Sequence, residues 1–314
     1  MDNAKKVALV LGSGSSRGWA HIGAIEALLE ENIPIDLIVG CSVGSYVAAI
    51  YAGNGLSSLK DFVLRMDGKK IFSYFDIVVP RSGLLNGTRR LKELFSKHTD
   101  ATLFSDLTIP VTMVATDLAT GDKVVLKSGE LMESLRATMA FPGLFAPVKI
   151  KDRWLVDGGL VDPIPVGIAR ATEADLIIAV DLNSGLISRN KSHCPGSQAR
   201  TDENEPSLAE EPMGEMTKKL MDFYTNAETS IKRRMTDFLG TDPTMPDIME
   251  TLANSIGIMQ DRITRINLAV DPPDILIQPR LGQTKMMDFD HVAYVIEEGY
   301  IGVKEKIEDI RNLL

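Results

Sequence analysis

Short apolar runs alternate along the chain with segments whose apolar residues recur at helical spacing. The apolar runs predict buried strands over 5–11, 34–40, 111–118, 123–128, 153–158, 175–182 and 274–279. Helices are predicted over 18–31, 42–53, 57–66, 88–98, 130–139, 164–171 and about 288–313. Strands that alternate with helices form a parallel sheet covered by helices. We therefore expect an α/β protein with a three-layer α/β/α fold and a mainly parallel central sheet.

The alternation is interrupted before the last predicted strand. Residues 185–215 are polar and rich in Pro, Ser, Gly and Asn. Such a segment buries too little apolar surface to offset the entropy lost on ordering it, so we expect a mobile surface loop. A helical insertion is predicted over about 213–268. The rest, about 5–184 and 270–314, forms the core of a single domain that spans 1–314.

Two long helices make up the predicted insertion, over about 213–239 and 244–267. Each carries one apolar stripe, and the stripe of the second consists of Ile248, Leu252, Ile256, Met259, Ile263 and Ile266. Nine of the fourteen methionines lie in 213–287. Methionine is an adaptable filler of helical cores, which is the favoured interpretation; a groove for acyl chains or a cap that contacts a membrane is the alternative.

Composition excludes several classes of function. The chain has 314 residues and a net charge of −9, without a basic stripe, which argues against nucleic acid as a partner and against strong attachment to anionic lipid. Cys41 and Cys194 are too few for a disulfide framework, and no Cys/His spacing indicates a metal site. No apolar run is long enough for a signal peptide or a membrane span, so we expect a cytoplasmic protein.

A glycine-rich turn follows the first predicted strand. The stretch "LGSGSSRG" (11–18) leads from that strand into a helix, and a helix N-terminus that presents unpaired N–H groups binds anions. Two anions fit such a turn: the pyrophosphate of a dinucleotide, or the oxyanion that forms while an ester is cleaved.

The second predicted strand ends in "GCSVG", Gly40 to Gly44, and a helix follows at once. Gly-x-Ser-x-Gly at a strand-to-helix turn is a nucleophile elbow, in which a strained serine stands clear of the sheet. A dinucleotide-binding fold requires an acidic residue where this strand ends, whereas Val39 and Gly40 stand there. The glycine turn is therefore better suited to an oxyanion than to a nucleotide-dependent oxidoreductase.

At these motifs the chain resembles the patatin-like phospholipases, in particular the small bacterial branch called RssA-like or neuropathy-target-esterase-like. The family's Gly-Gly-Gly-x-x-Arg-Gly motif matches 12–18 with Ser13 in its second place, Gly-x-Ser-x-Gly matches 40–44, and Asp-Gly-Gly matches 157–159. Further similarity lies in 136–148, 162–166 and 271–279. The resemblance covers nearly the whole chain and is least clear over 185–240.

The resemblance implies a Ser-Asp dyad, with Ser42 as the nucleophile and Asp157 as its general base. A serine hydroxyl needs such a base, and "LVDGG" places Asp157 where an apolar strand ends. Spacing alone favours a turn residue before glycine as the reading of Asp157, and the family motif reverses this preference. The oxyanion hole comprises Gly12, Ser13, Gly14 and Ser15: the N–H groups of Gly14 and Ser15 point at the oxyanion, and the other two shape the turn. Supporting motif residues are Arg17, Gly18, Gly40, Gly44, Gly158 and Gly159.

Two side-chain types leave alternatives open. A histidine could complete a triad, but His193 lies in the polar loop and His291 opens the final helix, while His21 reads as a packed or partly exposed residue of the first helix. Arg17 could contact an anionic headgroup, or it could brace the glycine turn by bonding to backbone carbonyls.

The expected function is hydrolysis of a carboxylic ester in a phospholipid or lysophospholipid, through an acyl-serine and with neither a metal nor an organic cofactor. The resemblance also implies calcium independence. The alternatives are an esterase or thioesterase for short acyl chains, and a non-catalytic regulatory protein that retains the fold. The partner is a lipid or acyl-ester substrate. A transient contact with the inner face of the membrane and a homo-oligomer are left open.

Overall fold

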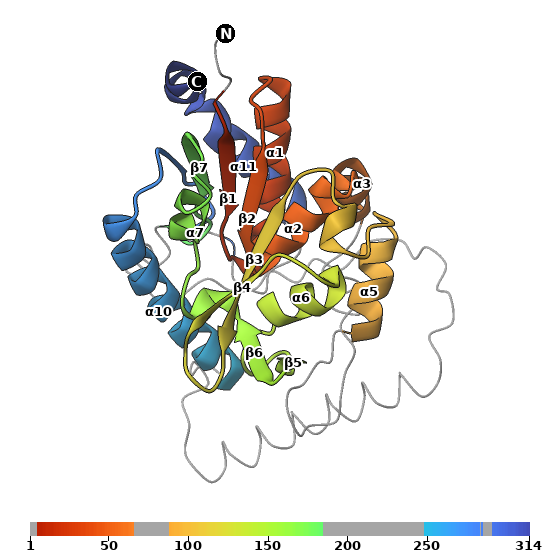
Figure 1. The fold of residues 1–314 in the computed structure, drawn as a ribbon. Helices are drawn as coiled ribbons and strands as arrows, with labels where there is room; N and C mark the ends of the chain where they lie inside the picture. The colour runs from red at the N-terminus through yellow and green to blue at the C-terminus, as the bar shows by residue number, and fades with distance from the viewer. Residues whose placement is uncertain (1–4, 66–87, 185–247, 283, 285–290) are drawn as a thin grey trace, which may run out of the picture. The chain divides into compact units, whose positions relative to one another are not determined.

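The computed structural model describes residues 5–65, 88–184, 248–282, 284 and 291–314 (Figure 1). One compact unit combines 1–191 with 252–314, and a second comprises 192–251. The predicted loop over 185–215 and the predicted helix over 213–239 lie outside the described residues. The organisation of 1–314 as a single domain therefore stays a prediction.

Among the described residues, an eight-stranded sheet forms the centre of the first unit, and it is mostly parallel, as predicted. In chain order the strands are β1 (Val7–Leu11), β2 (Leu37–Cys41), β3 (Val111–Asp117), β4 (Lys123–Leu126), β5 (Val148–Ile150), β6 (Arg153–Asp157), β7 (Leu176–Val180) and β8 (Ile275–Ile277). They run in the order β5-β6-β3-β2-β1-β7-β8, with β4 on β3. The five strands from β3 to β8 in this order are parallel, while β4, β5 and β6 pair antiparallel.

Strand β3 brings the ends of β2 and β6 together. Val114 pairs with Cys41 of β2 and with Val125 of β4, whereas the next residue, Ala115, pairs with Asp157 of β6 and with a β4 residue. Because a strand has only two edges, β4 occupies one edge of β3, and β2 and then β6 share the other. Residue 42, which follows β2, and Asp157, which ends β6, therefore meet beside β3.

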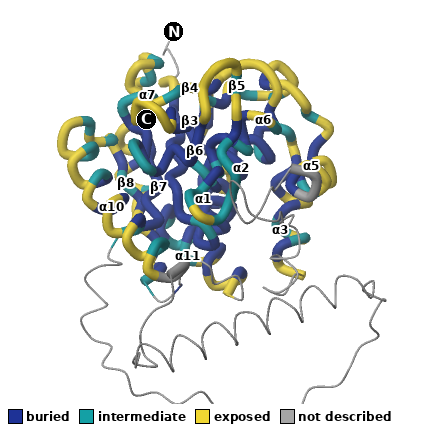
Figure 2. Tube along the Cα trace, turned by 90° about the horizontal axis from the view of Figure 1, so that it is seen from below, coloured by how far each residue is buried: buried dark blue, intermediate teal, exposed yellow. Residues whose placement is uncertain are grey.

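Helices cover both faces of the sheet. They are α1 (Ala20–Glu30), α2 (Val43–Ala52), α3 (Leu56–Leu64), α5 (Thr88–Ser96), α6 (Leu131–Thr138), α7 (Val166–Arg170), α10 (Ile248–Val270), α11 (Val292–Lys304) and α12 (Ile307–Leu313). Val7, Leu9 and Leu11 of β1 face a large core shared with α1, α2 and α11, and the alternate residues Ala8 and Val10 face a smaller core with α7 and α10. Buried positions gather at the centre of the unit (Figure 2).

The predicted elements recur with shifted ends, and three differ. The three-residue strand β5 was not predicted, because it is too short to show a period of two. The helix predicted over 18–31 begins as a 3₁₀ helix, Ser15–Trp19, that turns the glycine-rich segment into α1. The single final helix predicted over 288–313 is wrong. The chain turns between α11 and α12, so that Ile310 is buried and Arg311 reaches Glu31.

Helix α10 turns a different face inward from the one predicted. Of its predicted apolar stripe, Ile256 is buried, but Met259 is 51% and Ile266 64% exposed. The buried face instead carries Gln260, Asp261 and Thr264. Further along the helix, Asn267 donates to Asp162 at 3.2 Å, so α10 contacts polar groups at the carboxyl end of the sheet.

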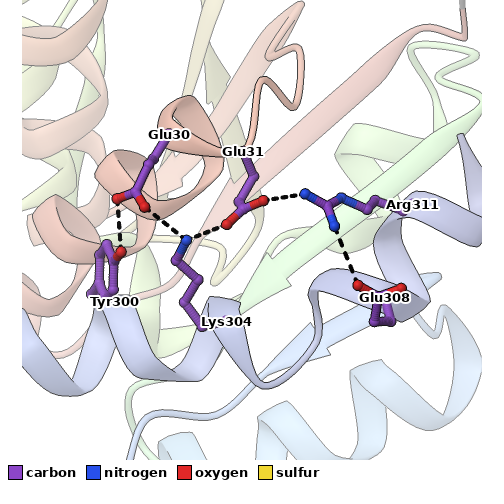
Figure 3. A network of polar contacts seen from close by, with 6 residues as sticks. All are labelled: Glu30, Glu31, Tyr300, Lys304, Glu308 and Arg311. Atoms are coloured by element: carbon purple, nitrogen blue, oxygen red, sulfur yellow. Dashed lines mark hydrogen bonds and ion pairs between the residues drawn. The ribbon is translucent and has the colours of Figure 1, made fainter.

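Helices α1 and α11 pack with their backbones almost in contact. A Cβ at Gly299 would lie 1.9 Å from the carbonyl oxygen of Ala20, and a Cβ at Gly23 would lie 1.9 Å from that of Ile296. At the other end of α1, Glu30 and Glu31 join a polar network with α11 and α12 (Figure 3). Its remaining members are Tyr300, Lys304, Glu308 and Arg311. The close packing at the glycines and the polar network at Glu30 and Glu31 thus hold α1 in place. The first turn of this helix follows the glycine-rich loop.

Candidate active site

Ser42 occupies a strained turn between β2 and α2. Its backbone has φ 53° and ψ −124°, in a region that non-glycine residues rarely adopt. The two glycines of this motif leave no room for a side chain. A Cβ at Gly40 would lie 2.6 Å from the Ser45 Cα, and one at Gly44 would lie 2.2 Å from the Leu11 carbonyl oxygen. The tight turn therefore places Ser42 at the carboxyl end of the sheet with its side chain partly accessible.

Asp157 accepts a hydrogen bond from Ser42, the Oγ–Oδ2 distance being 2.6 Å. Its other oxygen, Oδ1, accepts the N–H of Gly159 at 2.7 Å. Asp157 is 1% exposed, and this burial raises the pKa of its carboxyl group to about 6, although the bonds from Ser42 and Gly159 oppose the shift. A base with this pKa, bonded to a serine hydroxyl, is suited to accept its proton near neutral pH.

Thr138, at the end of α6, holds the backbone N–H of the strained serine. Its Oγ1 accepts the N–H of Ser42 at 3.0 Å and donates to the carbonyl of Val114 on β3. Thr138 is fully buried. Its role was not predicted, and no motif could have revealed it, because the contact spans 96 residues of sequence.

The glycine-rich loop lies directly against the serine turn. The Gly12 carbonyl oxygen would be 2.7 Å from a Cβ at Gly44, and a Cβ at Gly18 would be 2.2 Å from a Val43 methyl group. Two N–H groups of the loop are already bonded: that of Gly12 to the Val180 carbonyl at 3.2 Å, and that of Ser13 to the Pro163 carbonyl at 2.9 Å. The N–H of Gly14 has no hydrogen-bond acceptor among the described residues.

Three buried side chains hold the carbonyls of this loop. Arg17 donates from Nε to the Gly14 carbonyl at 3.3 Å, so it braces the loop, and at 2% exposure it is in no position to meet a headgroup at the surface. His21 donates from Nε2 to the Gly12 carbonyl at 2.8 Å, and Asn183 donates to the Ser13 carbonyl at 3.1 Å. The bracing roles of His21 and Asn183 were not predicted.

No histidine joins Ser42 and Asp157 within the described part of the chain. Burial lowers the pKa of His21 to about 4, so His21 is neutral at pH 7 and serves as a donor to the loop. His98 hydrogen-bonds to Ser58 at 2.7 Å, and the exposed His291 precedes α11. His193 lies outside the described residues.

The two glycines after Asp157, Gly158 and Gly159, have different surroundings. A Cβ at Gly158 would lie 2.2 Å from the Val114 carbonyl oxygen, so this residue packs against β3. A Cβ at Gly159 would meet three polar side-chain atoms: Gln260 Nε2 at 2.4 Å, Asp157 Oδ1 at 3.0 Å and Ser13 Oγ at 3.3 Å. Gln260 of α10 thus reaches the dyad. It was not predicted, because the apolar stripe of this helix was expected to face inward in its place.

The described residues contain no candidate for a metal site or for a membrane-spanning helix. Their His, Cys, Asp and Glu side chains form no group of three or more that could hold a metal ion. None of their helices is both long enough and apolar enough to cross a membrane. Most methionines of the predicted methionine-rich segment lie outside the described residues.

Comparison with known proteins extends these observations. A family model described as patatin-like phospholipase matches residues 9–170, which include the glycine-rich loop, Ser42 and Asp157. An uncharacterised NTE family protein of Mycobacterium tuberculosis is 36% identical over 181 residues, or 58% of this chain and 50% of that protein.

Two further relatives are longer. Patatin-like phospholipase domain-containing protein 6 of Homo sapiens is 34% identical over 184 residues, or 57% of this chain and 13% of that protein. Lysophospholipase NTE1 of Pyricularia oryzae is 34% identical over 187 residues, or 57% of this chain and 12% of that protein. The matched part of the chain therefore spans half of the mycobacterial relative and a small fraction of these two.

Among solved structures, VipD from Legionella pneumophila aligns with 98% of this chain and 67% of its own chain. The TM-score is 0.44 and the sequence identity 12%.

Proposed function

Because the chain belongs to the patatin-like phospholipase family, we propose that it hydrolyses carboxylic ester bonds of a lipid through Ser42 and Asp157. The substrate class is a phospholipid or a lysophospholipid. The observation that carries the proposal is the 2.6 Å hydrogen bond from Ser42 Oγ to the buried carboxyl group of Asp157. The name of the fungal relative, a lysophospholipase, agrees with this substrate class.

In the first half of the reaction, Ser42 attacks the acyl carbonyl of the ester. Asp157 takes the hydroxyl proton as the Oγ–carbon bond forms, because a neutral serine hydroxyl is a weak nucleophile. The tetrahedral intermediate then collapses, and the proton passes from Asp157 to the leaving alcohol. An acyl-serine remains, and Asp157 is again a carboxylate.

The negative charge of the intermediate needs donors beside Ser42. We assign this role to the N–H of Gly14, since the amides of Gly12 and Ser13 are bonded to backbone carbonyls. The motif implies the N–H of Ser15 as the second donor. Arg17, bonded to the Gly14 carbonyl, keeps this peptide in place. One such donor is worth about 3 kcal/mol in the transition state.

In the second half, water cleaves the acyl-serine. Asp157 accepts a proton from the attacking water, and the fatty acid leaves as the proton returns to Ser42 Oγ. All proton transfers use groups of the chain, the substrate and water, so the dyad completes the cycle without a metal or an organic cofactor.

The test is labelling with a fluorophosphonate probe, which reacts with activated serines. We expect the native chain to be labelled, Ser42→Ala to abolish labelling, and Asp157→Asn to slow it by about two or more orders of magnitude, as is typical when a general base is lost. The matched control is Ser45→Ala, which removes a neighbouring hydroxyl that contacts Thr138 and not Asp157.

Each outcome of the labelling has a definite meaning. Labelling that survives Ser42→Ala would place the nucleophile elsewhere and refute the dyad. A native chain that is folded but never labelled would favour a regulatory protein that retains the fold. For a labelled chain, a series of acyl esters of increasing length separates a lipid hydrolase, whose kcat/KM rises with chain length, from an esterase for short acyl chains.

A further inference from the structure

Gln260 places an uncharged amide beside the dyad from a distant part of the chain. It lies on α10, is 4% exposed, and its Nε2 would be 2.4 Å from a Cβ at Gly159. The same empty position is 3.0 Å from Asp157 Oδ1. The absence of a side chain at Gly159 is therefore what allows the Gln260 amide to approach the carboxyl group of the base.

The amide of Gln260 makes no hydrogen bond to a described residue, although it is more than nine-tenths buried. One turn further along α10, the buried Oγ1 of Thr264 also has no partner among the described residues. Burying the Thr264 hydroxyl without a partner costs free energy, so this hydroxyl adds unused hydrogen-bonding capacity to the same helix. Ser13 Oγ, 3.3 Å from the same empty position, adds a further hydroxyl.

The other sides of Asp157 are closed. Gly158 packs against the Val114 carbonyl, and the N–H of Asp157 is bonded to the Ala140 carbonyl. The Oδ2 atom faces Ser42, and Oδ1 holds the N–H of Gly159. Apart from Ser42, the polar side chains placed near this carboxyl group are those of Gln260 and Ser13, on the side of Gly159.

The acidic groups next to Gln260 are matched by cations. Asp261, which follows Gln260 on α10, interacts electrostatically with the buried Asp181. Asp261 is paired with Arg265, and Arg17 is the cation that acts on Asp181. Gln260 itself is uncharged, and its amide is suited to bind a neutral, hydrogen-bonding molecule.

We propose that Gln260 is a positioning residue for the hydrolytic water in the second half of the reaction. The inference rests on the proposed function. The Gln260 amide bonds to the water and holds it between itself and Asp157. The water oxygen then attacks the acyl carbon, one water proton moves to Asp157, and collapse of the intermediate breaks the bond to Ser42 Oγ. The Oγ takes that proton, and the fatty acid is released.

This role predicts a selective defect. Gln260→Met keeps the length of the side chain but removes its polar group. We expect acylation of Ser42 at the native rate and deacylation about tenfold slower, the fold-change that corresponds to one lost hydrogen bond. Hydroxylamine, a strong nucleophile that does not depend on Asp157, should cleave the acyl-enzyme of the variant as fast as that of the native chain.

The experiment follows the turnover of a p-nitrophenyl ester by stopped flow, with mass spectrometry of the acyl-enzyme on Ser42. The variant should show a native-rate burst, a slow steady state and accumulated acyl-enzyme. Arg262→Gln, an exposed change on the same helix, should behave as the native chain. Gln260→Asn, whose amide is one methylene shorter, provides the same test if Gln260→Met does not fold.

The outcomes separate this inference from the function on which it rests. A native chain that never acylates Ser42 overturns both. A native chain that turns over, with variants that deacylate at the native rate or lose acylation and deacylation equally, overturns the role of Gln260 alone. Slowing confined to the reaction with water supports it.

Discussion

Asp157 is buried, and yet the proposed reaction requires it to be ionised when Ser42 attacks. Burial alone would keep the carboxyl group neutral, whereas the hydrogen bonds from Ser42 and Gly159 favour the carboxylate, and the balance leaves the pKa at about 6. The group is therefore a carboxylate at neutral pH and still more basic than an exposed aspartate. A stronger base accepts the serine proton more readily.

The pH dependence of activity should report this balance. Because the carboxylate is the active form, kcat/KM should rise about tenfold per pH unit below the pKa and level off above about 6. The measurement is kcat/KM for an ester from about pH 4 to 8, with the rate of fluorophosphonate labelling followed in parallel. An inflection at the ordinary value for an exposed aspartate, near about 4, would contradict the burial of the base.

Ser13 shows why a departure from the three-glycine motif is tolerated. A Cβ at Gly12 would lie 2.8 Å from the Val180 carbonyl oxygen, and one at Gly14 would lie 2.7 Å from Leu182, so both positions are restricted. The side chain of Ser13 instead lies near Asn183, with Nδ2 3.5 Å from Oγ. The middle position of the loop therefore has room for a small polar residue.

Among the secondary-structure elements, the pairing of α1 with α11 supports the site from a distance. The first turn of α1 carries His21, which holds the glycine-rich loop through the Gly12 carbonyl. Gly23 and Gly299 let the two helices approach so closely that carbonyl oxygens of one helix touch the glycines of the other. Any side chain at this crossing must separate the helices.

Gly299→Ala should therefore destabilise the protein although alanine favours helices. Its Cβ would lie 1.9 Å from the Ala20 carbonyl oxygen, and overpacking of this kind costs about 1–3 kcal/mol. Thermal unfolding should show a fall in Tm of several degrees. Glu297→Ala, an exposed change on the same helix, is the control and should alter stability by less than about 0.5 kcal/mol. An unchanged Tm for Gly299→Ala would contradict the close packing.

Helix α10 illustrates how an element can be predicted correctly and yet oriented wrongly. Apolar periodicity correctly indicated a helix, but the hydrophobic stripe was only a guide to its buried face. The carboxyl end of the sheet presents Asp157, Asp162 and Asp181, and α10 meets these polar groups with Gln260, Asp261, Thr264 and Asn267. The need to place polar groups together overrode the preference for burying isoleucine and methionine.

For the molecule as a whole, stability and activity make opposite demands on the buried carboxyl groups. Burial raises the pKa of Asp157, Asp162 and Asp181. A carboxyl group whose folded-state pKa is raised stabilises the fold below its unfolded pKa, and this contribution is lost as the pH rises through the folded value. Near neutral pH, Asp157 is thus a carboxylate that its fold disfavours.

Asp157→Asn should therefore raise stability while it abolishes turnover. For Asp157 the shift from 3.8 to about 6 corresponds to roughly 3 kcal/mol, reduced in the variant because asparagine accepts fewer hydrogen bonds. The measurement is the free energy of unfolding of both proteins from about pH 4 to 8. The advantage of the variant should grow between about pH 4 and 6 and then stay constant.

Exposed acidic residues affect the native protein and the Asp157→Asn variant alike. Hydrogen bonds lower the pKa of Glu30 and Asp106, so their contributions are present above the unfolded pKa and are lost as the pH falls through the folded value. Both proteins contain them, and they cancel in the difference. An advantage of the variant that is independent of pH would show that the charge of Asp157 is not the cause.

The class of fold could be predicted without coordinates, and so could the residues to examine for a site. Apolar runs located seven of the eight strands, because burial in a sheet requires continuous apolar residues. Local motifs drew attention to Ser42, Asp157 and the glycine-rich loop, because a tight turn restricts residue types within a few positions. The family resemblance assigned the roles that spacing alone left open.

The side chains that surround those motifs became known only from the folded chain. Thr138 behind the serine, His21 and Asn183 on the loop, and Gln260 beside the base come from separate elements and carry no local signature. Their positions follow from the register of β2 and β6 on β3 and from the orientation of α10. These depend on how polar and apolar groups of the whole unit are satisfied together, which no short stretch of sequence contains.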